Sequence, residues 1–268
     1  MLREITLGQY YQTESRLHRL DPRVKLMGTL IFIISLFISQ KIACYAAATV
    51  FLICLIRLSK VPFSYMIKGM KAIVFIMLIT VLFNLFLTPG EPLVEFRIFR
   101  ITRQGLVNAS FTAVRLTYLI LGSTLMTLTT TPNDLTDGLE RGLGFMRVFK
   151  LPVHEIAMMM SIALRFIPIL MEETDKIMKA QQARGADFES GGLIKRTRAM
   201  VSLLVPLFVS AFRRANDLAM AMEARCYHGG EGRTKMNPLV YKPWDKRAYV
   251  ILFCYLAIVI LLGIVSPV

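Results

Sequence analysis

Five apolar runs constrain this chain more than any other feature, because each is close to the length that a helix needs to cross a lipid bilayer. They lie at about residues 24–39, 42–58, 69–88, 105–130 and 248–265. A spanning helix takes about 20 apolar residues, and in lipid a helix satisfies its own backbone hydrogen bonds. The sequence therefore predicts an all-α integral membrane protein with about five transmembrane helices.

The basic charge of the chain supports a membrane protein over a soluble one. The 268 residues are 55% hydrophobic and carry a formal net charge of +14. In a soluble protein this charge would suggest nucleic acid, but the chain shows no RNA- or DNA-binding motif. Its Lys and Arg residues instead flank the apolar runs, which is typical of membrane proteins. We therefore expect the lipid bilayer to be a partner, and no nucleic acid.

The basic residues also predict how the chain is oriented in the membrane. They are frequent in the N-terminal tail, in the loop near residue 60 and in the segment 131–247. The loop near residue 97 holds three arginines and two glutamates, which argues against this assignment. Because cytoplasmic loops collect Lys and Arg, the balance predicts a cytoplasmic N-terminus, five spans and an external C-terminus.

The segment 131–247 is too charged for ordinary lipid-facing helices and too apolar to lie free in water. We expect one short helix after Thr131, then two long helices at about 152–184 and 193–226. An apolar seam runs along each long helix in steps of four and three, which predicts that the two cross and pack. Its members are Ile156, Met160, Ala163, Ile167, Leu170, Thr174, Ile177, Gln181 and Arg184 in the first helix, and Leu204, Phe208, Ala211, Ala215, Leu218, Met222 and Arg225 in the second. The predicted domains are 1–130 (tail and first four spans), 131–247 (two long crossed helices and one short helix) and 248–268 (last span).

Each long helix ends in a similar triplet that contains an arginine. The triplets are Ala183, Arg184 and Gly185 in the first helix, and Ala224, Arg225 and Cys226 in the second. An exposed arginine can bind a carboxylate of another subunit through two hydrogen bonds. Alternatively, each triplet only caps its helix, because an arginine near a helix C-terminus complements the dipole and a glycine after it fits the cap. The residues alone leave both interpretations open.

Three further residues interrupt the apolar pattern. Pro168 and Pro206 stand inside the two long helices, where each is either a hinge or a static bend. Arg115 lies inside the fourth apolar run. An intramembrane charge is a functional candidate by default, but an arginine can also reach toward the interface. The role of Arg115 stays open.

The sequence predicts no catalytic, cofactor or metal site, and so no enzyme. There is no phosphate-binding loop for ATP and no nucleophilic elbow. The histidines His18, His154 and His228 lack metal-ligand spacing. No acidic residue lies inside the spans to carry a proton or cation, which weakens the alternative of a self-sufficient secondary transporter or channel.

The N-terminal residues carry a resemblance to a known family. The run Gly8-Gln9-Tyr10-Tyr11, then Ser15, His18 and Leu20–Lys25, resembles the start of the T components of energy-coupling factor (ECF) transporters. The two arginine triplets are similar to that family's paired coupling-helix motifs, although Cys226 stands where glycine is also common. The run Met222–Tyr227 with Gly229–Thr234 is similar too, and the resemblance covers nearly the whole chain.

The resemblance implies a coupling subunit in a prokaryotic cell membrane. Such a subunit joins two cytoplasmic ATPases of the ATP-binding-cassette (ABC) type to a small membrane subunit, the S component. Arg184 and Arg225 would each dock in a groove of one ATPase. Movement of the ATPases would pass through the crossed helices to the S component, which releases a vitamin or metal ion inside. Because the S component selects the substrate, the sequence leaves open which nutrient is imported.

Overall fold

The computed structural model describes residues 10–38, 41–96, 99–142, 144, 152–186, 188, 192–229 and 238–265. Gly8 and Gln9 of the N-terminal signature, and the run Gly230–Thr234, lie outside these residues. The chain forms two compact units. One consists of Met1–Leu7 and Leu139–Pro238, and the other of Gly8–Gly138 and Leu239–Val268.

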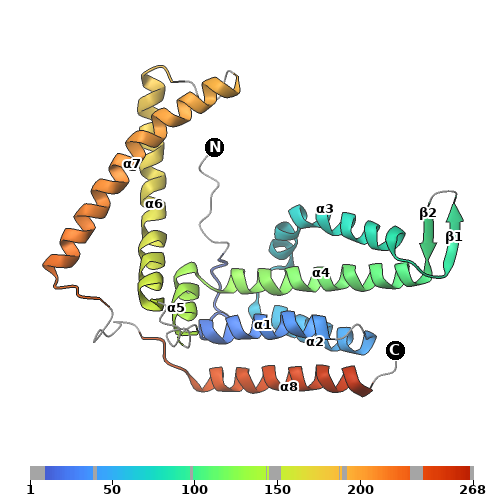
Figure 1. Ribbon diagram of the computed structural model, residues 1–268. Coiled ribbons are helices and arrows are strands. Elements are labelled where there is room, and N and C mark those ends of the chain that lie inside the picture. The colour runs from blue at the N-terminus through green and yellow to red at the C-terminus, as the bar shows by residue number, and fades with distance from the viewer. Residues whose placement is uncertain are drawn as a thin grey trace. The chain divides into compact units, whose positions relative to one another are not determined.

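The second of these units contains five long helices (Figure 1). They are α1 (Pro22–Ile38), α2 (Ile42–Ser59), α3 (Phe63–Leu87), α4 (Arg103–Thr129) and α8 (Pro243–Val265). Helices α1 and α8 pack side by side, α4 contacts α1 on another side, and α3 packs along α4. The predicted all-α membrane class is confirmed.

Local sequence signals explain where these helices begin and end. The Asp21 carboxylate accepts a hydrogen bond of 2.9 Å from the Arg23 backbone N–H and so caps α1, whose first residue is a proline. Thr102 caps α4 through a 3.0 Å hydrogen bond from the Gly105 N–H. Helix α2 stops at Lys60, whose backbone is left-handed (φ 55°).

Four of the described helices are long and apolar enough to cross a membrane, judged by length and composition alone. Three of them, α2, α4 and α8, are among the five expected spans. The fourth is α6 (Val153–Ala183), which the sequence analysis placed outside the spans. Its N-terminal half is almost uncharged and its acidic and basic residues gather in the C-terminal half, which explains why a window of spanning length fits inside it.

A β-hairpin joins α3 to α4, where the sequence analysis expected an irregular loop. Strands β1 (Pro92–Phe96) and β2 (Phe99–Thr102) are antiparallel, with Val94 opposite Ile101 and Glu95 opposite Arg100. The run is too short and too charged to show a clear alternating pattern. Pro89 and Gly90 follow the end of α3 and account for its termination, but such helix-breaking residues do not indicate strand pairing.

The core of the five-helix unit forms where α1, α2, α4 and α8 meet. The rings of Phe51 and Tyr255 stack at a centroid distance of 4.2 Å. Gly122 of α4 allows close approach of α1, because a Cβ there would lie 2.8 Å from the Phe32 ring. The buried hydroxyls of Ser35 and Tyr255 are 2.8 Å apart and satisfy each other.

The other unit is built on two long helices that cross, as expected. Helix α6 and helix α7 (Leu193–Ala224) pack against each other and run in opposite directions, crossing near the ends that the intervening turn connects (Figure 1). Both helices are continuous through their interior prolines, Pro168 and Pro206. The expected short helix is α5 (Pro132–Gly142), and the boundary between the two units falls inside it.

Candidate functional site

The first arginine triplet closes α6 with two specific backbone hydrogen bonds. The Ala186 N–H donates to the Gln181 carbonyl at 2.9 Å, and the Gly185 N–H donates to the Gln182 carbonyl at 2.9 Å. Gly185 has a φ of 88°, a left-handed conformation that glycine adopts without steric cost. Together these features make a Schellman cap, with Arg184 at the C-cap position.

The second triplet closes α7 in the same way. The Tyr227 N–H donates to the Met222 carbonyl at 3.0 Å, and the Cys226 N–H donates to the Glu223 carbonyl at 2.9 Å. Cys226 takes the left-handed position with a φ of 55°. Arg225 is again the C-cap residue. The two triplets therefore share one cap geometry, in which the third residue supplies the left-handed turn.

In each triplet the cap depends on the third residue and does not depend on the arginine side chain. The backbone of the third residue makes the cap, so the arginine side chain is not needed for it. Arg184 and Arg225 are both exposed, and neither has an ion-pair partner among the described residues. Both guanidinium groups are thus exposed to solvent, each at the end of a helix that is closed by a backbone cap.

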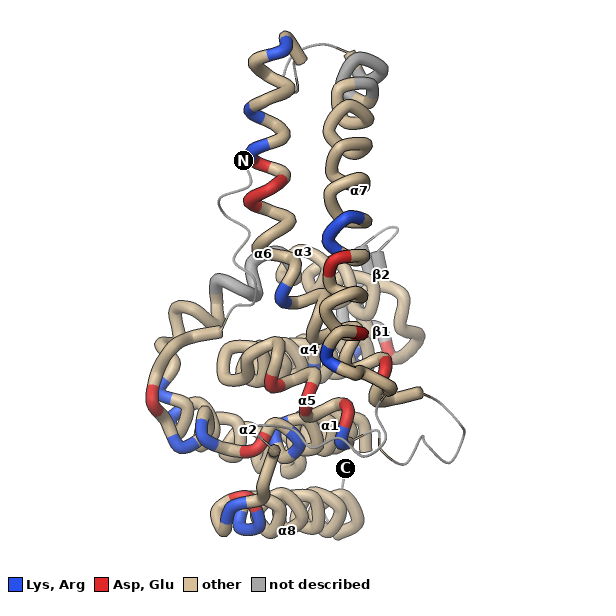
Figure 2. Tube along the Cα trace, turned by 90° about the vertical axis from the view of Figure 1, so that its left-hand side faces the viewer, with Lys and Arg blue, Asp and Glu red and all other residues tan. Residues whose placement is uncertain are grey.

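The described side chains that link α6 to α7 include one ion pair. The Arg214 guanidinium of α7 lies 3.2 Å from the Glu173 carboxylate of α6, and both side chains are partly exposed. Figure 2 shows that most acidic and basic residues of α6 lie in its C-terminal half, and that the charges drawn on α7 follow an uncharged stretch of that helix.

The apolar seam between the helices is only partly where the spacing predicted it. In α6, Ile167, Leu170 and Ile177 are half-buried as expected, whereas the predicted Ile156, Met160 and Ala163 are exposed. In α7, the predicted Leu204 and Phe208 are exposed, and Leu203 and Leu207 are covered in their place. A straight helix drifts from a spacing of 3.5 residues by about 20° per heptad, which is enough to exchange neighbouring positions over a long seam.

The N-terminal signature forms a polar cluster beside the end of α4. The Tyr11 N–H donates to the Leu128 carbonyl at 2.9 Å. The His18 ring lies between two partners, with Nε2 3.1 Å from the Tyr11 carbonyl and Nδ1 2.6 Å from the Ser15 hydroxyl. The carbonyl can only accept, so Nε2 carries the proton and Nδ1 accepts from the hydroxyl. Burial, together with the nearby Lys25 charge, lowers the pKa of His18.

A second polar cluster joins the start of α1 to the start of α8. The buried Asp245 carboxylate accepts hydrogen bonds from the Asp21 N–H at 3.0 Å and the Lys242 N–H at 2.7 Å. Asp21 binds Arg23 through both carboxylate oxygens, at 3.0 and 2.8 Å. The Lys25 ammonium donates to the Thr129 carbonyl at 2.7 Å. The residues that carried the resemblance therefore hold three helix ends together.

Sequence reasoning missed Asp245, although one signal was present. Lys242 precedes Pro243 at the first helical position, and Asp245 is three residues after Lys242. An acidic residue at that third position often returns a hydrogen bond to the backbone N–H of the cap residue, as observed here. The partner at Asp21 is 224 residues away and leaves no local signal.

Arg115 has partners inside the helix bundle. Its Nε donates to the Tyr45 hydroxyl at 3.0 Å, and its guanidinium lies 5.2 Å from the centre of the Phe37 ring. An intramembrane arginine that faces the bundle in this way is stabilised by a hydrogen bond and a cation–π contact. These contacts connect α4 to α1 and α2.

Comparison with known proteins identifies what the chain resembles. The family described as "Cobalt transport protein" (CbiQ) matches residues 13–236. A protein of Clostridium kluyveri is 51% identical over 261 residues, which cover 97% of this chain and 96% of that protein. A protein of Bacillus subtilis is 49% identical over 263 residues, which cover 98% and 99%. Both are called energy-coupling factor transporter transmembrane protein EcfT.

Proposed function

The chain belongs to the CbiQ family and, within it, to the EcfT-type transmembrane components of energy-coupling factor transporters, and from this premise we propose that it is the non-catalytic coupling subunit of an ATP-driven importer. In this proposal α6 and α7 receive movement from two ABC-type ATPase subunits. They pass it to a membrane S component, which delivers a vitamin or metal ion. The membrane is the cell membrane of a prokaryote, with the N-terminus in the cytoplasm.

The single observation that carries the proposal is the pair of exposed arginines at equally capped helix ends. Because each cap is made by the backbone, Arg184 and Arg225 are free to bind outside partners. The two helices run in opposite directions, so their C-terminal ends lie far apart within their unit (Figure 1). This separation supports two docking sites, one on each ATPase, in preference to one shared site.

Docking in this proposal uses the complete triplets. The arginine binds a carboxylate-containing groove, where a guanidinium makes paired and charge-assisted hydrogen bonds. The flanking residues, Ala183 and Gly185 in one triplet and Ala224 and Cys226 in the other, are small and let the groove close around the helix end. Pro168 and Pro206 are the proposed hinge positions, since each lacks the hydrogen bond that stiffens a helix interior.

The test is charge reversal at the docking arginines in the assembled transporter. Arg184→Glu or Arg225→Glu should reduce ATP-dependent uptake and co-purification of the ATPases. The protein should still insert into the membrane and keep the backbone caps at the ends of α6 and α7. Arg213→Glu is the matched control, because this exposed arginine of α7 has no described ion-pair partner. Full ATPase binding by the Arg184→Glu/Arg225→Glu double variant, or substrate uptake by the chain alone in liposomes, would contradict the proposal.

A further inference from the structure

A groove lined mainly by apolar side chains lies within the five-helix unit, between α1, α2, α4 and α8. Its volume is about 710 Å³. Phe32 of α1, Leu55 of α2, Leu125 of α4 and Leu252 of α8 line it. Gly28 and Gly122 also face the groove and leave room in it, because neither has a side chain. The groove thus offers an apolar surface between four helices, three of which (α2, α4 and α8) are long and apolar enough to cross a membrane.

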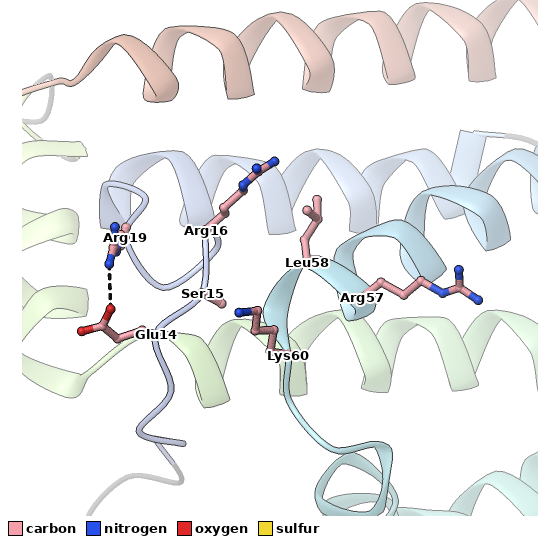
Figure 3. Close-up of a pocket in the computed structure, with 7 residues that line it drawn as sticks. All are labelled: Glu14, Ser15, Arg16, Arg19, Arg57, Leu58 and Lys60. Atoms are coloured by element: carbon pink, nitrogen blue, oxygen red, sulfur yellow. Dashed lines mark hydrogen bonds and ion pairs between the residues drawn. The ribbon is translucent and has the colours of Figure 1, made fainter.

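A basic pocket continues this groove toward the N-terminal segment (Figure 3). Arg16, Arg19 and Leu58 line both hollows, so the two are contiguous. The pocket adds Arg57 and Lys60, and its volume is about 570 Å³. Four cationic side chains therefore gather at one end of an apolar groove.

Three of these four cations have no ion-pair partner among the described residues. Arg19 is paired with Glu14 at 2.7 Å, whereas Arg16, Arg57 and Lys60 are exposed and unpaired in the described part of the chain. Figure 3 shows the Lys60 ammonium directed back toward Ser15, and the Arg57 side chain running away from it.

The backbone of Lys60 is held in an unusual conformation. Its φ is 55°, which is uncommon for a residue with a side chain. The next residue, Val61, donates its N–H to the Ser59 hydroxyl at 3.2 Å, and Ser59 is fully buried. Glycine would fit this turn with less strain, so the presence of a lysine side chain here is consistent with use of its charge.

The residues at the start of α8 indicate the depth of the groove in the membrane. Trp244 and Arg247, in the first turns of α8, also line the groove, and both are exposed. Tryptophan and basic residues concentrate at the level of the lipid headgroups. The cationic end of the groove therefore lies at the interface, and the apolar remainder lies beside the hydrocarbon.

We propose that this groove binds one anionic phospholipid, with the phosphate at Arg16 and Lys60 and an acyl chain along the apolar lining. Unpaired basic side chains at the interface attract anionic headgroups, and the apolar lining of the groove matches an acyl chain. A free phosphate would satisfy the cations but leave the groove empty. This lipid site is separate from the proposed coupling through α6 and α7.

The test measures lipid binding to the full chain purified in a neutral detergent. Native mass spectrometry would compare phosphatidylglycerol with phosphatidylcholine of the same acyl chains. We expect preferential retention of phosphatidylglycerol. The Arg16→Gln/Lys60→Gln variant should weaken its retention about 25-fold, from roughly fivefold for each basic residue near the headgroups. The control Lys176→Gln/Arg213→Gln removes the same charge from α6 and α7 and should bind as the wild type does.

A second variant tests the apolar half of the site. Cys54 of α2 lines the groove without taking part in the basic pocket, so Cys54→Trp would fill the groove and keep every charge. It should also weaken retention of phosphatidylglycerol. Equal retention of both lipids, equal loss in the control pair, or full retention by either Arg16→Gln/Lys60→Gln or Cys54→Trp would overturn the proposal. Loss by the charge variant with full retention by Cys54→Trp would indicate a simple anion site instead.

Discussion

Cys226 and Gly185 occupy the same position in the caps of α7 and α6, yet only Gly185 is free of steric strain there. A left-handed backbone costs about 1–2 kcal/mol for a residue with a Cβ. Cys226→Gly should therefore stabilise the end of α7, by less than about 1 kcal/mol after the added freedom of the unfolded chain is included. Gly185→Ala should weaken the end of α6 by about 1 kcal/mol.

Amide hydrogen exchange at Cys226 and Tyr227 measures this effect directly, since their N–H groups make the cap bonds. Protection should rise in Cys226→Gly and fall at Gly185 and Ala186 in Gly185→Ala. An unchanged exchange rate in both variants would show that the caps do not limit opening of these helix ends.

His18 should make the stability of the N-terminal cluster depend on pH. Burial lowers the pKa of His18 below its ordinary value of 6.5, so the folded protein takes up a proton less readily than the unfolded chain. The contribution of His18 to the free energy of unfolding is therefore constant above pH 6.5, and it decreases as the pH drops below that value. Thermal unfolding between pH 8 and pH 5 should show this decrease, and His18→Gln should show a smaller one. An equal decrease of the unfolding temperature with pH in the wild type and in His18→Gln would contradict the assignment of this pH dependence to His18.

Asp245 uses both carboxylate oxygens to accept backbone hydrogen bonds, and it is only 1% exposed. Asp245→Asn keeps the shape of the side chain but replaces one acceptor with an N–H donor. One buried backbone N–H is then left unpaired, which should lower the free energy of unfolding by about 1–3 kcal/mol. Thermal or denaturant unfolding in detergent measures the loss. The exposed Asp217→Asn serves as the control. An equal loss of stability in that variant would contradict a stabilising role of the buried hydrogen bonds to Asp245.

At the scale of helices, the ion pair between Glu173 and Arg214 should matter more for the register of α6 on α7 than for stability. Both side chains are partly exposed, so the pair contributes about 0–1 kcal/mol. Arg214→Glu should therefore unfold almost as the wild type does, but it places like charges between the helices and should lower coupled uptake. The Glu173→Arg/Arg214→Glu exchange should restore uptake. No recovery in the exchanged variant would show that the pair has no positioning role.

Helix positions were the most predictable part of the fold. The expected helices at 152–184 and 193–226 match α6 and α7 closely, because glycine, proline and charge mark their ends. The cap at Cys226 was not foreseen as left-handed, since cysteine has no preference for that conformation. The β-hairpin and the exchange of Leu204 for Leu203 in the seam were also missed. Both depend on packing between segments, which local sequence does not record.

At the scale of the whole molecule, the sequence identified the polar N-terminal residues but not what they contact. Tyr11, His18 and Lys25 meet the end of α4, and Asp21 meets Asp245 near the start of α8. Contacts over such separations are set by the folded topology, not by spacing. The proposed docking of the arginine triplets on ATPase subunits rests on the family resemblance, while their capping role could be argued from chemistry alone and is seen in the backbone hydrogen bonds.

The opposed directions of α6 and α7 lead to a prediction about subunit stoichiometry. If the C-terminal end of each helix docks on a different ATPase, then Arg184→Ala and Arg225→Ala should each weaken one contact only. Alanine keeps the caps, because these depend on backbone groups. In the absence of nucleotide, each single variant should purify with one ATPase subunit and the double variant with neither, as measured by the mass of the complex. If either single substitution released both subunits, the two helix ends would have to share one docking site, and movement could not enter the protein at two separate points.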